Sequence, residues 1–198
     1  MPTTSSRFAV LASVAAAAAI VAAAGCGAGQ NTATVDVQFD TLVAYALNGT
    51  DPLQPSAFDL ASASLVVPDG TLSFDVAFDI NPRGHALLEP AGAVAADFGS
   101  EFGPGTRRVG LQRSALAFDS IQFAPTSHYF FDSTFVLVPE QTVIIATSPP
   151  GCAGTSNPTV YGKMVLDSVN LTLRTIHFRA TVDPNCGFRS FLPGLPTR

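Results

Sequence analysis

Apolar and polar residues alternate along several stretches of this chain, a pattern typical of half-buried β-strands. The clearest stretch is residues 71–80, in which every second residue is large and apolar. The alternation places Asp75 and Asp79 on the opposite face, which we expect to be exposed to solvent. Shorter patterns of the same kind predict further strands at residues 35–39, 65–67, 86–94, 109–113, 128–138 and 142–147.

The C-terminal part of the chain predicts a β-hairpin. Two strand-forming runs, residues 160–166 and 171–182, flank a polar stretch at residues 167–170 that we expect to form the turn. An antiparallel hairpin brings its two outer ends together. Cys152 and Cys186 lie just outside those ends, so the hairpin predicts that the two cysteines are neighbours.

The number and spacing of these strands predict an all-β fold. We expect about nine or ten strands, with turns at intervals of roughly ten residues and no helix of three turns. This pattern is typical of an antiparallel β-sandwich. No internal repeat or long linker divides the chain, so residues 35–198 are predicted to form one sandwich domain.

Residues 1–25 have the layout of a secretory signal. Arg7 supplies a positive charge, and residues 8–24 form an uninterrupted run of apolar and small residues. A transmembrane helix is the alternative, but it needs about 20 strongly apolar residues. This run is mostly alanine and no basic cluster follows it. We therefore expect the segment to be cleaved and the domain to be exported.

The stretch Ala23-Ala24-Gly25-Cys26 resembles the lipobox of bacterial lipoproteins. In that family the cysteine thiol receives a diacylglyceryl group, and the signal is cut immediately before it. The resemblance implies that Cys26 is lipidated, that its acyl chains bind a membrane, and that the protein lies in the cell envelope on the outer-membrane or periplasmic side. Residues 26–34 would then be a short tether. Ordinary cleavage after Ala24 is the alternative and would leave Cys26 as a free thiol.

The chain has 3 cysteines, an odd number for an exported protein. If Cys26 is lipidated, Cys152 and Cys186 remain as a pair that an exported compartment allows to oxidise. A metal site is the alternative use of this pair. No C-x-x-C motif or nearby pair of histidines supports such a site. We therefore predict a disulfide between Cys152 and Cys186 and no metal.

The charge of the chain is low and unevenly distributed. Charged residues make up 13% of the sequence, and the formal net charge is −5. Residues 27–159 carry 13 acidic and 4 basic residues, whereas residues 160–198 carry 2 acidic and 5 basic ones. The basic strands either pair with acidic ones across a sheet, or Arg174, Arg179 and Arg189 form an anion-binding patch. The acidity of the whole chain argues against nucleic acid as a partner.

No catalytic motif is evident, and we expect no cofactor. The three histidines, His85, His128 and His177, are far apart and lack the short spacings of metal ligands. No G-x-S-x-G elbow is present. Asp75 and Asp79 could form the carboxylate pair of a glycosidase, but exposed aspartates are common on strands, where they deter edge pairing.

Taken together, these patterns predict a lipid-anchored, non-enzymatic binding or assembly module with an unknown protein or glycan partner. A carbohydrate-binding or adhesion domain is an alternative, although the chain has no tryptophan and only 3 tyrosines beside 15 phenylalanines. A hydrolase with a dispersed site is a further alternative and requires a histidine beside a carboxylate in a pocket. We expect binding at the loops of residues 95–108 and 148–158.

Overall fold

The computed structural model describes residues 31–69, 71, 73–98 and 107–197. Residues 31–198 belong to one compact unit. The predicted signal of residues 1–25, the lipobox-like stretch ending at Cys26 and the first residues of the predicted tether lie outside the described part of the chain. Cleavage of the signal and lipidation of Cys26 therefore stay predictions.

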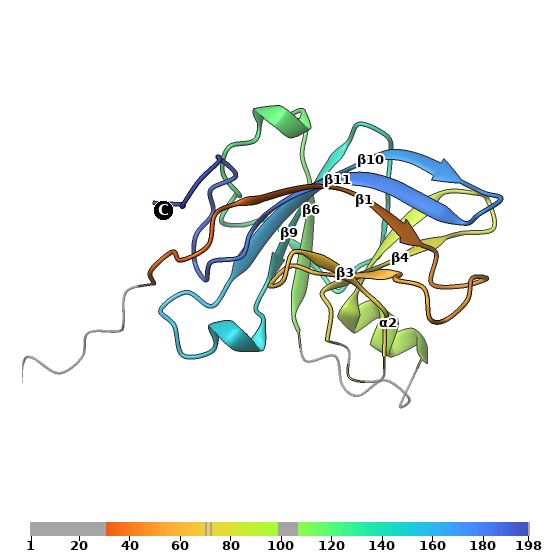
Figure 1. The fold of residues 1–198 in the computed structure, drawn as a ribbon, viewed down its shortest axis with the longest axis horizontal. Coiled ribbons are helices and arrows are strands. Elements are labelled where there is room, and N and C mark those ends of the chain that lie inside the picture. Colours follow the sequence, from red (N-terminus) through yellow and green to blue (C-terminus); the bar gives the residue numbers. More distant parts are fainter. Residues whose placement is uncertain (1–30, 70, 72, 99–106, 198) are drawn as a thin grey trace, which may run out of the picture. The chain divides into compact units, whose positions relative to one another are not determined.

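The described chain folds into two antiparallel β-sheets that enclose the main hydrophobic core (Figure 1), which confirms the predicted sandwich-like, all-β fold. The six-stranded sheet has the order β1-β11-β10-β9-β6-β7 and the five-stranded sheet the order β3-β2-β4-β5-β8. The strands of the first sheet are β1 (Gln38–Tyr45), β11 (Thr175–Asp183), β10 (Val160–Asn170), β9 (Thr142–Thr147), β6 (Val109–Arg113) and β7 (Phe130–Phe131). Those of the second are β3 (Ser64–Val66), β2 (Ala57–Asp59), β4 (Val76–Ile80), β5 (Ala86–Pro90) and β8 (Phe135–Val136).

Three buried phenylalanines join the two sheets at the centre of the core. Phe178 of β11 stacks on Phe78 of β4, with ring centroids 4.6 Å apart, and meets Phe58 of β2 at 6.1 Å in an edge-to-face arrangement. Burying each of these side chains stabilises the fold by roughly 1.5–3 kcal/mol before conformational entropy is charged against it. This contact fixes how the sheets face each other.

Strand β4 is shorter than predicted, and both of its faces are covered. Its alternate residues Val76, Phe78 and Ile80 face the main core, as the pattern indicated. The other face packs against the helix α2 (Ala91–Phe98), through a separate cluster that includes Ala77 and Val94. The prediction of a single strand over residues 86–94 is wrong, because β5 ends at Pro90 and the helix follows at once.

The prediction that Asp75 and Asp79 face solvent is wrong as well. Their side chains are almost fully buried. Asp75 accepts hydrogen bonds from Leu60 and Thr147, and Asp79 accepts hydrogen bonds from the amide and the side chain of Asn48. Each has a cationic partner: Asp79 pairs with Arg174 at 3.3 Å, and Asp75 pairs with Arg107 at 3.2 Å. A buried carboxylate requires such a partner, since an unpaired charge is very costly to desolvate.

The predicted hairpin is formed by β10 and β11, but its turn lies at residues 171–174. There the Leu173 amide donates to Asn170 Oδ1 at 2.9 Å, and Arg174 adopts a positive φ of 50°. The prediction of a turn at residues 167–170 is wrong, because this stretch continues β10 beyond a bulge between Leu166 and Ser168. The polar residues there belong to the exposed end of a long strand.

A disulfide links Cys152 and Cys186, as the sequence predicted, with the two Cα atoms 5.5 Å apart. Cys152 lies in the 3₁₀ turn η4 (Pro150–Cys152), in the loop between β9 and β10, and Cys186 follows the end of β11. The bond therefore ties the loop of residues 148–159 to the segment that leaves the six-stranded sheet.

The described end of the predicted tether is bound to the domain. Asn31 Nδ2 donates to the carbonyl oxygens of Cys186 at 2.6 Å and of Asn157 at 3.0 Å, and the Thr34 amide donates to Asn185 Oδ1 at 2.8 Å. These contacts place the start of the described chain next to the disulfide, close to its C-terminal end (Figure 1).

The predicted strand at residues 128–138 is divided between the two sheets. β7 pairs with β6 in one sheet and β8 pairs with β5 in the other, and a positive φ of 51° at Asp132 lies between them. A second 3₁₀ turn, η3 (Phe118–Ser120), precedes this corner. Within the described residues, no helix has the length and apolar character needed to cross a membrane.

Candidate functional site

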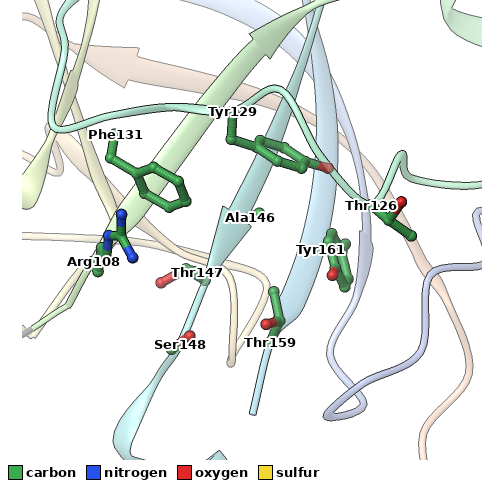
Figure 2. A pocket seen from close by; sticks show the side chains of 9 residues that line it. All are labelled: Arg108, Thr126, Tyr129, Phe131, Ala146, Thr147, Ser148, Thr159 and Tyr161. Carbon is green, nitrogen blue, oxygen red and sulfur yellow. The ribbon is translucent and has the colours of Figure 1, made fainter. Parts of the chain in front are cut away.

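A pocket of about 220 Å³ opens on the outer face of the six-stranded sheet, beside β6, β9 and β10 (Figure 2). Ala146 of β9 lies in the middle of it, and aromatic side chains stand around this floor. We call it the tyrosine pocket. It is lined by Arg108 ahead of β6, Thr126, Tyr129 and Phe131 around β7, Ala146, Thr147 and Ser148 at the end of β9, and Thr159 and Tyr161 at the start of β10.

Two of the three tyrosines of the chain meet in this pocket. The rings of Tyr129 and Tyr161 lie 6.5 Å apart, centroid to centroid, at an angle of 47°. Tyr161 packs into a cluster with Ile144 and Phe191 on the outer face of the sheet, and Tyr129 packs against that cluster. The pocket therefore offers aromatic surface held in place by a small hydrophobic core of its own.

The Tyr129 hydroxyl is a neutral hydrogen-bond donor. Burial raises the pKa of Tyr129, the neighbouring Tyr161 raises it further, and the positive charge of Arg189 opposes this only in part. The phenol thus stays protonated and donates to the carbonyl oxygen of Pro125 at 2.9 Å. Its oxygen can still accept a hydrogen bond from a ligand.

Other hydroxyl groups of the pocket have no protein partner within the described residues. They belong to Thr126, Ser148, Thr159 and Tyr161. A free hydroxyl can donate one hydrogen bond and accept others. Aromatic rings interleaved with free hydroxyls match a ligand that has both an apolar ring face and polar groups around its edge.

Arg108 supplies the positive charge of the pocket. Its guanidinium carbon lies 3.8 Å from the centroid of the Phe131 ring, a cation–π contact. Within the part of the chain that the structure describes, no carboxylate lies within ion-pairing distance of Arg108. The Phe131 ring packs on one face of the guanidinium, and the N–H groups at the edge of the guanidinium stay available to an anion.

The preceding residue, Arg107, points away from the pocket, and its charge is paired within the protein. It contacts the carboxylates of Asp59 and Asp75 and is largely buried. Asp75 also accepts a hydrogen bond from the Thr147 hydroxyl at 2.6 Å and from the Leu60 amide at 2.7 Å. Because Thr147 lines the pocket, this buried ionic cluster lies directly behind it.

The pKa values of the two carboxylates in the cluster are shifted in opposite directions. Burial raises the pKa of Asp75, against the charge of Arg107 and the Thr147 hydrogen bond. Burial also acts to raise the pKa of Asp59, but hydrogen bonds from Ser62 and Arg107, together with the Arg107 charge, outweigh it, and the net pKa is lowered. Arg107 therefore acts to lower the pKa of both carboxylates: it limits the cost of burying Asp75 and helps to keep Asp59 charged.

Gly110 of β6 allows the aromatic wall to approach the sheet. A Cβ atom at this position would lie 2.8 Å from Tyr129 Cβ and 2.9 Å from Phe131 Cε1, closer than carbon atoms pack. Any other residue would push these two side chains outward. The glycine is thus a positioning residue for the pocket.

A buried lysine supports the neighbouring segment. Lys163 of β10 donates from Nζ to the carbonyl oxygens of Phe118 at 2.7 Å and Ile121 at 2.9 Å. Burial lowers the pKa of Lys163, and the charge of Asp119 opposes this effect. The amine fixes the turn that precedes Thr126, so it supports one wall of the pocket indirectly.

The loop that the disulfide anchors contributes to the same pocket. Ser148 and Thr159, at the two ends of the loop that Cys152 anchors, both line it. The Thr159 carbonyl also accepts a hydrogen bond from the Gly187 amide at 2.7 Å, next to Cys186. The two loops expected to carry binding, residues 95–108 and 148–158, thus contribute Arg108 and Ser148 to one pocket.

Two other hollows lie near Gln112 and Arg113, with volumes of about 300 and 380 Å³. The larger is bounded by His128, Phe130 and Phe135 and is mainly apolar. Their shared arginine is already engaged, since Arg113 donates to the Val136 carbonyl at 3.0 Å and to Gln141 at 2.8 Å. The tyrosine pocket is smaller but has unused polar groups, so we take it as the candidate site.

The three histidines belong to different parts of the fold. His85 is exposed at the start of β5, His128 bonds to the Ser127 hydroxyl, and His177 lies 3.3 Å from the Thr175 hydroxyl on β11. No carboxylate within the described residues pairs with any of them. The described residues also contain no group of three or more side chains that could hold a metal ion.

The C-terminal arginines are used in two ways. Arg174, in the turn between β10 and β11, pairs with Asp79 of β4 in the other sheet, and Arg179 pairs with Asp167 of β10 at 3.0 Å within the C-terminal hairpin itself. Arg189 has no carboxylate partner in the described chain and donates to the Ala124 carbonyl. Its charge acts on Tyr129, so only this arginine of the three belongs to the neighbourhood of the pocket.

No protein-family model matches this chain, and no curated protein or solved structure is measurably similar to it. Among the described residues, those that line the tyrosine pocket include no carboxylate, histidine or cysteine. A nucleophile with an adjacent base is thus missing among them, and the arrangement is suited to binding.

Proposed function

We propose that this protein is an exported, lipid-anchored binding module of the bacterial cell envelope, and that the tyrosine pocket binds one ring of a glycan. The observation that carries the binding proposal is a set of hydroxyls that have no partner in the described chain and are interleaved with Tyr129, Tyr161 and Phe131 around a single floor. The ring face of a sugar packs on aromatic side chains, while its hydroxyls need hydrogen-bond partners around the rim.

The size of the pocket sets the size of the ligand. Pockets that enclose drug-sized molecules have volumes of roughly 300–1,000 Å³, whereas this one has about 220 Å³ and an open mouth. It accommodates one sugar ring, either free or within a longer chain that leaves through the mouth. This supports a module that binds glycans over an enzyme that encloses its substrate.

The cysteines support the export and anchoring part of the proposal. Cys152 and Cys186 are joined to each other, which leaves Cys26, in its lipobox-like context, as the remaining cysteine of the sequence. A disulfide of this kind persists in oxidising compartments outside the cytoplasm. The membrane would then be the partner of the acyl chains on Cys26, and the glycan the partner of the domain.

Mass spectrometry of the N-terminus tests the anchor. In cells that express the full sequence, we expect a diacylglyceryl group on Cys26 and loss of residues 1–25. The variant C26S is expected to leave the membrane fraction. An unmodified Cys26, or a retained Met1, would contradict anchoring without affecting the binding proposal.

A glycan array tests the binding. The wild-type protein is expected to bind a defined set of glycans, and the variants Y161F and T159V, which remove one hydroxyl each, are expected to lose signal on that set. Y45F is the matched control, because Tyr45 lies on β1, at the far side of the six-stranded sheet. Absence of any signal, or equal loss in the control, would refute the pocket as the binding site.

A further inference from the structure

The charge of the tyrosine pocket narrows the class of its ligand. We propose that the bound sugar is acidic and carries a carboxylate group, which binds the guanidinium of Arg108. This inference rests on the proposed glycan-binding function and adds the chemical class of the sugar. It depends on three observations: an arginine with no carboxylate partner among the described residues, a pocket that these residues line without an acidic side chain, and a fixed orientation of the guanidinium.

The positive charge of this pocket contrasts with the rest of the protein. The chain has a formal net charge of −5, yet no acidic side chain of the described residues lines the pocket, and Arg108 is exposed at its mouth. Arg189 lies close enough for its charge to act on Tyr129. A local positive potential within an acidic protein attracts a negatively charged ligand but does not attract a neutral one.

Arg107 and Arg108 are adjacent in the chain but have different environments. Arg107 is enclosed by Asp59 and Asp75 on the inner side, so the chain on entering β6 turns Arg108 to the outer face. The described fold thus neutralises one arginine and leaves its neighbour without a carboxylate. The second arginine is the one that a ligand can pair with.

The contact with Phe131 orients the guanidinium for a carboxylate. The ring lies 3.8 Å from the guanidinium carbon and covers one face of the planar group. The N–H groups at the edge of that plane can form two parallel hydrogen bonds to a carboxylate, and such charge-assisted bonds are about twice as strong as neutral ones. A single arginine balances the single charge of a carboxylate, whereas a phosphate monoester carries about −1.5 to −2.

Isothermal titration calorimetry with the purified full-length protein tests the inference. The probes are methyl glycosides of glucuronic acid, galacturonic acid and N-acetylmuramic acid, each compared with its neutral glucose, galactose or N-acetylglucosamine counterpart. Sodium acetate and glucose 6-sulfate are added as further arms, to separate the carboxylated sugar from a carboxylate alone and from another anion. We expect at least one acidic sugar to bind about tenfold more tightly than its neutral counterpart, since the site gains a charge-assisted hydrogen bond.

Variants assign the effect to Arg108. R108Q is expected to abolish the difference in affinity between acidic and neutral sugars. Higher salt should weaken the binding of the acidic sugar by the wild-type protein more than that of the neutral sugar. R83Q is the matched control, because Arg83 is exposed in the turn at residues 81–84, away from the pocket. The midpoint of urea unfolding shows that each variant is folded.

The possible failures are distinguishable. Equal affinity for acidic and neutral sugars overturns the acidic class but leaves the glycan-binding function in place. Tighter binding of glucose 6-sulfate than of every carboxylated sugar overturns the carboxylate assignment, and binding of acetate as tight as the acidic sugar shows that the ring contributes nothing. No binding by any probe overturns both this inference and the proposed function.

Discussion

Replacing Arg107 by glutamine is expected to destabilise the protein far more than the same change at its neighbour Arg108. The two positions lose the same charge and gain the same side chain. Arg107, however, contacts two largely buried carboxylates, whereas Arg108 lies at the mouth of a pocket with no carboxylate within ion-pairing distance in the described chain. Because the substitution is the same, any difference in stability between R107Q and R108Q reports the burial and ion pairing of Arg107.

The expected loss of folding stability in R107Q follows from the two carboxylates that this variant leaves without a cation. Asp75 is fully buried and Asp59 is mostly so, and neither has another cationic partner among the described residues. Removing one member of a buried ion pair costs about 3–5 kcal/mol, because an uncompensated charge remains. R108Q removes an exposed charge and one cation–π contact, and should stay within about 0.5–1 kcal/mol of the wild type.

Urea unfolding at pH 7 measures both effects. With a slope of about 2 kcal/mol per molar urea, R107Q should lower the unfolding midpoint by roughly 1.5–2.5 M, and R108Q should barely move it. Loss of Arg107 should also raise the pKa of Asp75 further, since burial is then opposed only by the hydrogen bonds from Thr147 and Leu60. Protonation of Asp75 removes the uncompensated charge, so the destabilisation by R107Q should shrink as the pH falls.

Two outcomes would refute this reasoning. If R107Q and R108Q shifted the midpoint equally, the buried cluster would not be what holds this region together. If the destabilisation by R107Q did not decrease at low pH, the uncompensated Asp75 charge would not be its cause.

Three further predictions concern the disulfide, the buried acid and the pocket wall. The double variant C152A/C186A should lose about 4 kcal/mol, the loop-closure value for a bond that spans 34 residues, and wild-type protein unfolded in reductant should match it in urea titrations. Burial raises the pKa of Asp183, and the hydrogen bonds from Asn185 oppose this shift only in part. The protonated Asp183 side chain therefore contributes its full stability below about pH 4, and this contribution is lost as the pH rises through the pKa of the folded state. D183N should therefore be at least as stable as the wild type at pH 7 and flatten this part of the pH–stability curve; an unchanged curve would contradict it. G110A should displace Tyr129 and Phe131 and weaken glycan binding in calorimetry, whereas G151A, whose added Cβ has no neighbour within 4 Å, should not.

The strands and the disulfide could be predicted because their signals are local. The strands at residues 109–113 and 142–147 appear with the predicted bounds, since each is a short apolar run between turn residues. The disulfide followed from two facts available in the sequence, the odd number of cysteines and the hairpin geometry. Neither inference needed knowledge of how the sheets pack.

The environment of β4 could not be predicted from its alternation. The pattern of residues 71–80 marks one apolar face, but it does not show that helix α2 covers the other. Asp75 and Asp79 lie on positions that would be exposed in an uncovered sheet. Their partners, Arg107 and Arg174, are distant in sequence, so the buried ion pairs depend on tertiary structure alone.

The tyrosine pocket was also beyond local patterns. Tyr129 and Tyr161 come from segments 32 residues apart in sequence, and the sequence shows no spacing that would link them. One signal was available: alternation in residues 108–112 puts Val109 and Leu111 in the core and hence Arg108 on the outer face. A free arginine beside a strand was thus detectable, but the aromatic rings around it were not.

The pocket exists only in the folded chain, and this couples ligand binding to stability. Its walls come from the segments around β6, β7, β9 and β10, and each is held by a contact that also maintains the fold: the Arg107 cluster, the close approach at Gly110 and the disulfide. A ligand that binds only the folded state stabilises it, by about 2.7 kcal/mol at a concentration of 100 times Kd. Because Thr147 donates to Asp75 directly behind the pocket, changes to the buried cluster should weaken binding even where no residue of the cluster touches the ligand. The ionic cluster and the binding site are therefore two sides of one part of the six-stranded sheet.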